Sequence, residues 1–154
     1  RDAIPPLVGT NLEGKPITVD YRGSAVPVVI YVITPFGHFV ERNEANFAAV
    51  VRQGGSFKYV VLAPNTAANK RLHEYIEKVR PAWGKAAVDI VHRIAPELKD
   101  DMMLNSYPTT LVVSPAGRLI KNFQGAYADD SVSAKPVDIE RFFGIKLPGL
   151  LPRR

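Results

Sequence analysis

Apolar residues form almost unbroken runs at two places in the chain, residues 26–33 and 57–63. Both runs are rich in β-branched residues, which is typical of strands that are buried on both faces of a sheet. Three shorter runs predict further strands, at 88–91, 109–114 and 118–124. The chain is therefore expected to have a sheet at its centre.

Between these strands the apolar residues recur at helical spacing. One helix is predicted across 39–53, and Phe39 is expected to lie on its buried side. The same spacing and the positions of prolines predict three more helices, at 72–79, 96–104 and 139–143.

The beginning of the chain has a different pattern. Pro5 and Pro6 fix an extended backbone, and the turn residues of 11–16 predict a hairpin. A hairpin followed by alternating strands and helices indicates an α/β fold with a central mixed sheet flanked by helices. The length of 154 residues predicts one domain over 1–154, with a core at about 4–145 and an extended C-terminal tail at 146–154.

The chain contains no cysteine, which limits its chemistry more than any other feature of its composition. Cysteine-free chains have no disulfide, no thiolate nucleophile and no Cys-ligated zinc. The net charge of +5 comes from basic residues scattered along the sequence, so no nucleic-acid partner is expected. The apolar runs are far shorter than the roughly 18 residues of a membrane helix, so no membrane span is expected. Because the chain starts at Arg1, a removed N-terminal signal or anchor stays open.

Three short motifs follow one another along the chain. Residues 5–23 contain two prolines, a Leu-Glu-Gly-Lys-Pro turn and then Tyr-Arg-Gly, and residues 28–35 contain an apolar strand that ends in Thr-Pro. Residues 106–118 contain Ser-Tyr-Pro-Thr-Thr, three apolar residues and a turn with glycine. In this order the motifs resemble the thioredoxin superfamily, specifically its TlpA/ResA-like (AhpC/TSA–redoxin) branch, over residues 4–145.

The resemblance implies a thioredoxin-like fold with an N-terminal β-hairpin extension, a cis peptide bond before Pro108, and an extracytoplasmic (periplasmic or secreted) location, with a cytoplasmic one left open. It also implies an active-site Cys-x-x-Cys motif at the start of the helix after the central strand. In this chain the corresponding residues are Phe36, Gly37, His38 and Phe39. Phenylalanine has neither a nucleophile nor a redox couple, so this motif cannot carry out thiol–disulfide exchange.

The residues of the altered motif have several interpretations. Phe36 either fills core space or belongs to an exposed aromatic patch where a partner docks, and both interpretations stay open. His38 lacks an acidic partner at a diagnostic spacing, so a solvated residue is favoured over a general base. The sequence has no His or Cys pattern with metal-ligand spacing, and we expect no catalytic residue, metal or cofactor.

The loop at Pro108 is the second candidate region. The resemblance implies that this loop lies against the altered motif and that the backbone at Tyr107 faces an extended peptide. Phe36, Tyr107, Pro108 and Thr109 are therefore candidate peptide-binding residues, acting by strand addition. A scaffold turn without a binding role is the alternative.

Two functions follow from these observations. The first is a redox-inactive thioredoxin-fold protein that binds a protein or peptide. The alternative is a thiol–disulfide or peroxide-reducing oxidoreductase that uses a noncysteine mechanism or a thiol supplied by a partner. The sequence indicates neither the identity of the partner nor the oligomeric state.

Overall fold

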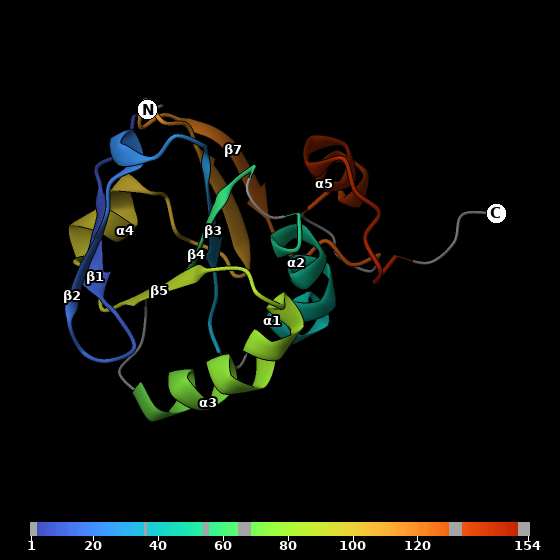
Figure 1. Ribbon diagram of the computed structural model, residues 1–154, viewed down its shortest axis with the longest axis horizontal. Coiled ribbons are helices and arrows are strands. Elements are labelled where there is room, and N and C mark those ends of the chain that lie inside the picture. Colours follow the sequence, from blue (N-terminus) through green and yellow to red (C-terminus); the bar gives the residue numbers. More distant parts are fainter. Residues whose placement is uncertain (1–2, 36, 54–55, 65–68, 130–133, 151–154) are drawn as a thin grey trace.

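Seven strands among the described residues form one mixed sheet in the order β2-β1-β5-β4-β3-β6-β7 (Figure 1). The computed structural model describes residues 3–35, 37–53, 56–64, 69–129 and 134–150. The strands are β1 (Leu7–Thr10), β2 (Pro16–Val19), β3 (Val28–Val32), β4 (Lys58–Ala63), β5 (Val88–His92), β6 (Thr109–Val113) and β7 (Leu119–Gln124). The predicted α/β architecture with a mixed sheet and an N-terminal hairpin is confirmed.

The two longest apolar runs of the sequence become the centre of the sheet. Strands β3 and β4 are parallel, with Ile30 opposite Val60, and every residue of β3 is buried. Their β-branched side chains suit a strand that is covered on both faces. On its other side β3 pairs with β6 in antiparallel fashion, with Val32 opposite Thr109. Because the two strands are antiparallel, the chain that follows β3 and the chain that precedes β6 lie at the same end of these strands.

Helices cover both faces of the sheet (Figure 1). The elements are α1 (His38–Arg42), α2 (Glu44–Val51), α3 (Asn69–Val79), α4 (Pro96–Asp101), α5 (Pro136–Phe143) and the 3-10 turns η1 (Tyr21–Gly23) and η2 (Arg80–Trp83). Helices α2, α3 and α5 contribute to one apolar cluster, whereas α4 and the N-terminal hairpin contribute to the other. No helix among the described residues is long and apolar enough to cross a bilayer.

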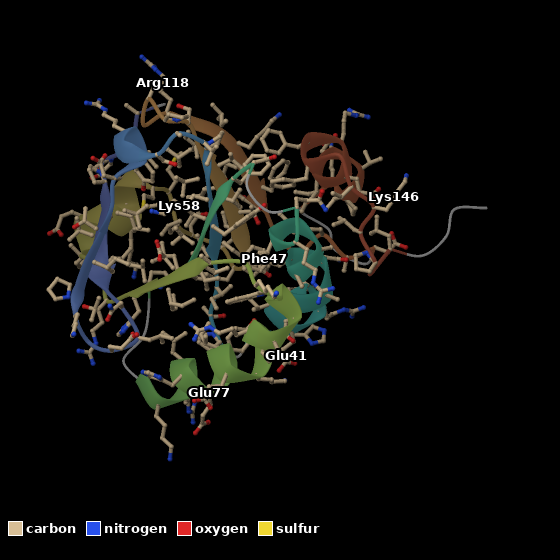
Figure 2. All side chains as sticks on the ribbon, in the orientation of Figure 1. Glu41, Phe47, Lys58, Glu77, Arg118 and Lys146 are labelled. Carbon is tan, nitrogen blue, oxygen red and sulfur yellow. The ribbon has the colours of Figure 1, made fainter. Side chains whose placement is uncertain are left out.

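Aromatic rings fill much of the cluster beneath α2 and α3. Phe47 stacks on Tyr31 with ring centroids 4.1 Å apart, and Trp83 meets Phe47 edge-on at 6.0 Å. Figure 2 shows Phe47 inside the molecule, whereas Glu77, Arg118 and Lys146 lie at the periphery of the view. The separation of aromatic and charged side chains is that of an ordinary hydrophobic core.

The prediction of one continuous helix over 39–53 was wrong. Asn43 separates α1 from α2, and its side chain is fully buried. Its backbone N–H donates to the carbonyls of Phe39 and Val40, so the first helix closes before the second begins. The sequence pattern missed this break because no proline or glycine marks a helix end between residues 39 and 53.

The first part of the predicted C-terminal tail, up to residue 150, packs against the rest of the chain. Leu147 is buried and a turn follows at Pro148–Gly149. The Leu147 N–H donates to Glu140 Oε2 at 2.9 Å, and the Gly149 N–H donates to Asn46 Oδ1 at 2.7 Å. These bonds hold the segment against α5 and α2. Residues 151–154 lie outside the described residues.

The N-terminal hairpin is joined to the rest of the sheet through β5. Thr10 pairs with His92, and the buried imidazole of His92 donates from Nε2 to the carbonyl of Asn11 at 3.0 Å. Burial lowers the pKa of His92 and outweighs the hydrogen bond to Asn11, which raises it; the nearby charges of Arg93 and His73 also lower it. The folded protein therefore favours neutral His92.

We expect the free energy of unfolding to fall as the pH drops through the range around and below the ordinary histidine pKa of about 6.5. In that range the unfolded chain binds a proton at position 92 that the folded chain binds less readily. Urea unfolding at pH 7.5 and pH 5.5 measures how strongly the free energy of unfolding depends on pH. This dependence should be weaker in His92→Gln. An equal dependence in both proteins, together with an ordinary His92 pKa in an NMR titration, would contradict the prediction.

Candidate functional site

The altered motif begins where β3 leaves the sheet. The Gly37 N–H donates to the Thr34 carbonyl at 3.1 Å, which closes a turn before α1. A β-carbon at Gly37 would lie 2.7 Å from Thr34 Oγ1 and 3.2 Å from Val40 Cγ2, so a larger residue here would force these side chains to shift. Phe36 lies outside the described residues.

His38 and Phe39 are the first residues of α1, and both are exposed. The expectation that Phe39 is buried was wrong, because 44% of its surface is accessible, whereas the next residue, Val40, is fully buried. The break at Asn43 explains the error, since a single helix through 39–53 would have placed Phe39 in line with the apolar residues of α2. The rings of His38 and Phe39 meet edge to face at 5.5 Å.

No acidic partner for His38 is found among the described residues; its contact there is the Phe39 ring. That placement matches a solvated histidine better than an oriented general base, which needs a second group to fix its tautomer. In the ranges that the structure describes, no group of three or more His, Asp or Glu side chains could hold a metal ion.

The loop before β6 lies beside this segment because Val32 pairs with Thr109. The Tyr107–Pro108 peptide bond is cis, as the resemblance implies. Tyr107 is half-buried and packs against the second apolar cluster, whereas Pro108 is buried. The structure thus brings together the two regions that the sequence singled out.

Internal hydrogen bonds occupy much of this loop. The Thr109 hydroxyl donates to the Ser106 carbonyl at 2.8 Å, and the Gly125 N–H donates to the Pro108 carbonyl at 2.8 Å. Thr109 is only 2% exposed. Thr109 and Pro108 therefore shape the loop, whereas Ser106 and Tyr107 are only half-buried.

A buried polar network lies behind the motif, and sequence analysis missed it. Asn43 Nδ2 donates to the Tyr31 hydroxyl at 2.9 Å, and the Tyr127 N–H donates to Asn43 Oδ1 at 2.8 Å. The hydroxyls of Tyr127 and Thr110 share a hydrogen bond. Burial raises the pKa of both tyrosines, so they remain neutral and act only as hydrogen-bonding groups. The network ties the α1–α2 junction to the sheet.

Comparisons with known proteins bear on the fold. No family model and no curated protein matches the sequence. A thioredoxin family thiol:disulfide interchange protein from Chlorobium tepidum TLS has a TM-score of 0.64 at 15% identity, over 94% of this chain and 95% of that protein. StoA from Bacillus subtilis has a TM-score of 0.62 at 15% identity, over 82% of this chain and 92% of that protein. The fold is thioredoxin-like.

A third solved structure extends the comparison. A SCO1/SenC family lipoprotein from Bacillus anthracis str. Ames has a TM-score of 0.66 at 16% identity, over 93% of this chain and 94% of that protein. The thioredoxin-like fold expected from the three motifs is confirmed, and the β1–β2 hairpin is its N-terminal extension. The finer assignment to the TlpA/ResA-like branch stays a prediction.

The thioredoxin-like fold is present in this chain without sulfur at its altered motif. None of the 154 residues is cysteine, so these residues supply no thiolate for disulfide exchange. The described residues of the motif instead include an exposed histidine and an exposed phenylalanine, and a half-buried tyrosine lies in the loop before β6. Such a surface can bind apolar or aromatic groups.

Proposed function

We propose that this chain is a thioredoxin-fold binding module, without redox chemistry of its own, that docks a protein or peptide partner. The binding surface, here called the motif surface, consists of Phe36, His38, Phe39 and Tyr107. The observation that carries the proposal is the exposure of Phe39 in the segment that follows β3; the Tyr107 loop precedes β6, the strand that pairs with β3. Water-exposed aromatic surface is costly, and aromatic residues are enriched at the centres of protein interfaces.

The proposal includes three finer assignments. We place the chain in the TlpA/ResA-like branch because its three motifs occur in the order of that branch. We place it outside the cytoplasm, which is supported by that branch and by the description of the SCO1/SenC relative as a lipoprotein. We also treat residues 1–154 as one domain, since a single sheet runs through the described residues.

Replacing Phe39 by serine is expected to weaken partner binding about 30-fold, which corresponds to a hot-spot contribution of roughly 2 kcal/mol. Because Phe39 is exposed, the variant should fold as the parent does. Peptides that bind the parent chain on an array are titrated against both proteins by fluorescence anisotropy. Tyr107→Ala should weaken the binding of the same peptides.

A matched control is Ile120→Ser, because Ile120 is 45% exposed on β7, a different part of the sheet. This variant should bind as the parent does. Equal binding by the parent chain, Phe39→Ser and Tyr107→Ala would contradict the proposal. An insulin-reduction assay tests the alternative function, since turnover above the blank would require a thiol from elsewhere.

A further inference from the structure

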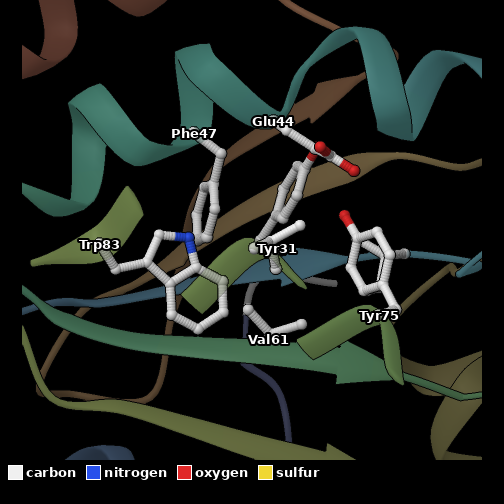
Figure 3. Close-up of a pocket in the computed structure, with 8 residues that line it drawn as sticks. Tyr31, Glu44, Phe47, Val61, Tyr75 and Trp83 are labelled. Carbon is white, nitrogen blue, oxygen red and sulfur yellow. The ribbon is translucent and has the colours of Figure 1, made fainter. Parts of the chain in front are cut away.

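A small pocket lies between α2, α3 and the sheet (Figure 3). Its walls include the side chains of Tyr31, Glu44, Phe47, Val61, Tyr75 and Trp83. The enclosed part offers about 10 Å³ to the centre of a water-sized group, which is room for about one heavy atom. The pocket is partly open to solvent, and its open side is here called the mouth. Glu44 in its wall is only half-buried.

The walls combine aromatic rings with one unsatisfied carboxylate oxygen. Tyr31, Phe47 and Trp83 are buried, and their rings come from β3, α2 and η2. Glu44 Oε1 is buried and has no hydrogen-bond partner among the described residues. Figure 3 shows the Glu44 carboxylate and the Tyr75 hydroxyl pointing toward each other above the rings.

Each of the neighbouring hydroxyl groups already has one hydrogen-bond partner. Tyr75 forms a hydrogen bond with the Glu44 carboxylate, and the Tyr31 hydroxyl accepts from Asn43. A buried water needs two to four polar partners, and here it would find Glu44 Oε1 and the proton of the Tyr31 hydroxyl, whereas an ammonium group would also contact the faces of the rings. Those faces and the carboxylate both attract positive charge. An anion would be repelled.

We propose that this pocket binds a primary ammonium group, either of a small alkylammonium ion or of a lysine side chain. The nitrogen would donate to Glu44 Oε1 and contact the aromatic faces, while its carbon substituent would leave through the mouth. The enclosed volume excludes quaternary ammonium groups. The proposal stands apart from the proposed function, because it uses neither Phe39 nor Tyr107.

Charges around the mouth are compatible with this binding. Burial raises the pKa of Glu44, whereas Lys78 on α3 and the hydrogen bond with Tyr75 lower it, and Glu41 on α1 raises it. A bound ammonium group would stabilise the ionised carboxylate in the same way as Lys78, but from inside the pocket.

The test uses Trp83, the only tryptophan of the chain, as a reporter. Methylammonium chloride is titrated against sodium chloride at equal ionic strength while the indole N–H signal is followed by NMR. We expect a saturable shift with a dissociation constant on the order of 10 mM. Glu44→Gln preserves the size and one oxygen of the side chain, and it should weaken binding at least about tenfold.

Control experiments separate the alternatives. Glu77→Gln, at an exposed position of α3, should bind as the parent does, and tetramethylammonium should give no saturable shift. Binding of N-acetyl-lysine amide as well as methylammonium indicates a polypeptide lysine as the source, whereas binding of methylammonium alone indicates a free amine. The proposal would be overturned if methylammonium chloride shifted the indole signal no more than sodium chloride does, or if Glu44→Gln bound methylammonium as tightly as the parent. Either result would indicate that the pocket holds only water.

Discussion

Replacing Asn43 by alanine is expected to lower the free energy of unfolding by about 2–4 kcal/mol. Asn43 is fully buried and uses both ends of its amide, toward the Tyr31 hydroxyl and the Tyr127 N–H. Alanine would leave that backbone N–H buried without a partner, which costs roughly 1–3 kcal/mol by itself. Urea unfolding followed by tryptophan fluorescence measures the loss.

Two further variants make this prediction specific. Asn122→Ala removes an exposed asparagine from β7 and should change stability by less than about 0.5 kcal/mol. Tyr31→Phe removes one of the two hydrogen bonds, so its effect should not add fully to that of Asn43→Ala in a double-mutant cycle. A loss for Asn43→Ala as small as that for Asn122→Ala would refute the role of the network.

The network also connects stability with the proposed binding surface. Asn43 ends α1 only four residues after Phe39, and its side chain fixes that junction on β3. A variant that loosens the junction would change the position of Phe39 as well as the stability. Weakened peptide binding by Tyr31→Phe, in which Phe39 and Tyr107 are intact, would therefore show that the motif surface depends on its buried support.

The sequence predicted the sheet well because its strands depend on local composition. The runs at 26–33 and 57–63 are apolar and β-branched, and they became β3 and β4 with ends shifted by one or two residues. Strand assignment needs no knowledge of distant parts of the chain when a strand is covered on both faces.

The candidate site was harder to predict because its residues depend on distant partners. Asn43 is buried by Tyr31 and by Tyr127, which is 84 residues away, and nothing in the local pattern indicates this. The exposure of Phe39 follows from the break at Asn43 and was missed for the same reason. Proximity of Pro108 to the motif was expected only through the resemblance, since local spacing carries no such information.

The Glu44 pocket shows the same limit. Tyr31, Phe47, Tyr75 and Trp83 each fit the apolar pattern of their own element, and the sequence suggests only that they are core residues. Their convergence around a carboxylate depends on how α2, α3 and η2 cross the sheet.

Replacing Gly9 by alanine is expected to destabilise the protein by about 1–3 kcal/mol and to loosen the hairpin first. A β-carbon at Gly9 would lie 2.6 Å from the His92 carbonyl oxygen and 2.7 Å from Val91 Cγ1. The oxygen belongs to the backbone of β5, so it cannot move aside without disturbing the pairing of Thr10 with His92. The overlap should therefore separate β1 from β5.

Hydrogen exchange distinguishes this local effect from general destabilisation. Amides of β1 and β2 in Gly9→Ala should exchange at least about tenfold faster than in the parent chain, while β3 amides change only with global stability. Gly23→Ala is the matched control, because a β-carbon there meets its nearest atom at 3.9 Å. If the β1 and β2 amides exchange at the same rate in both variants, the close approach of β1 to β5 does not restrict position 9 to glycine.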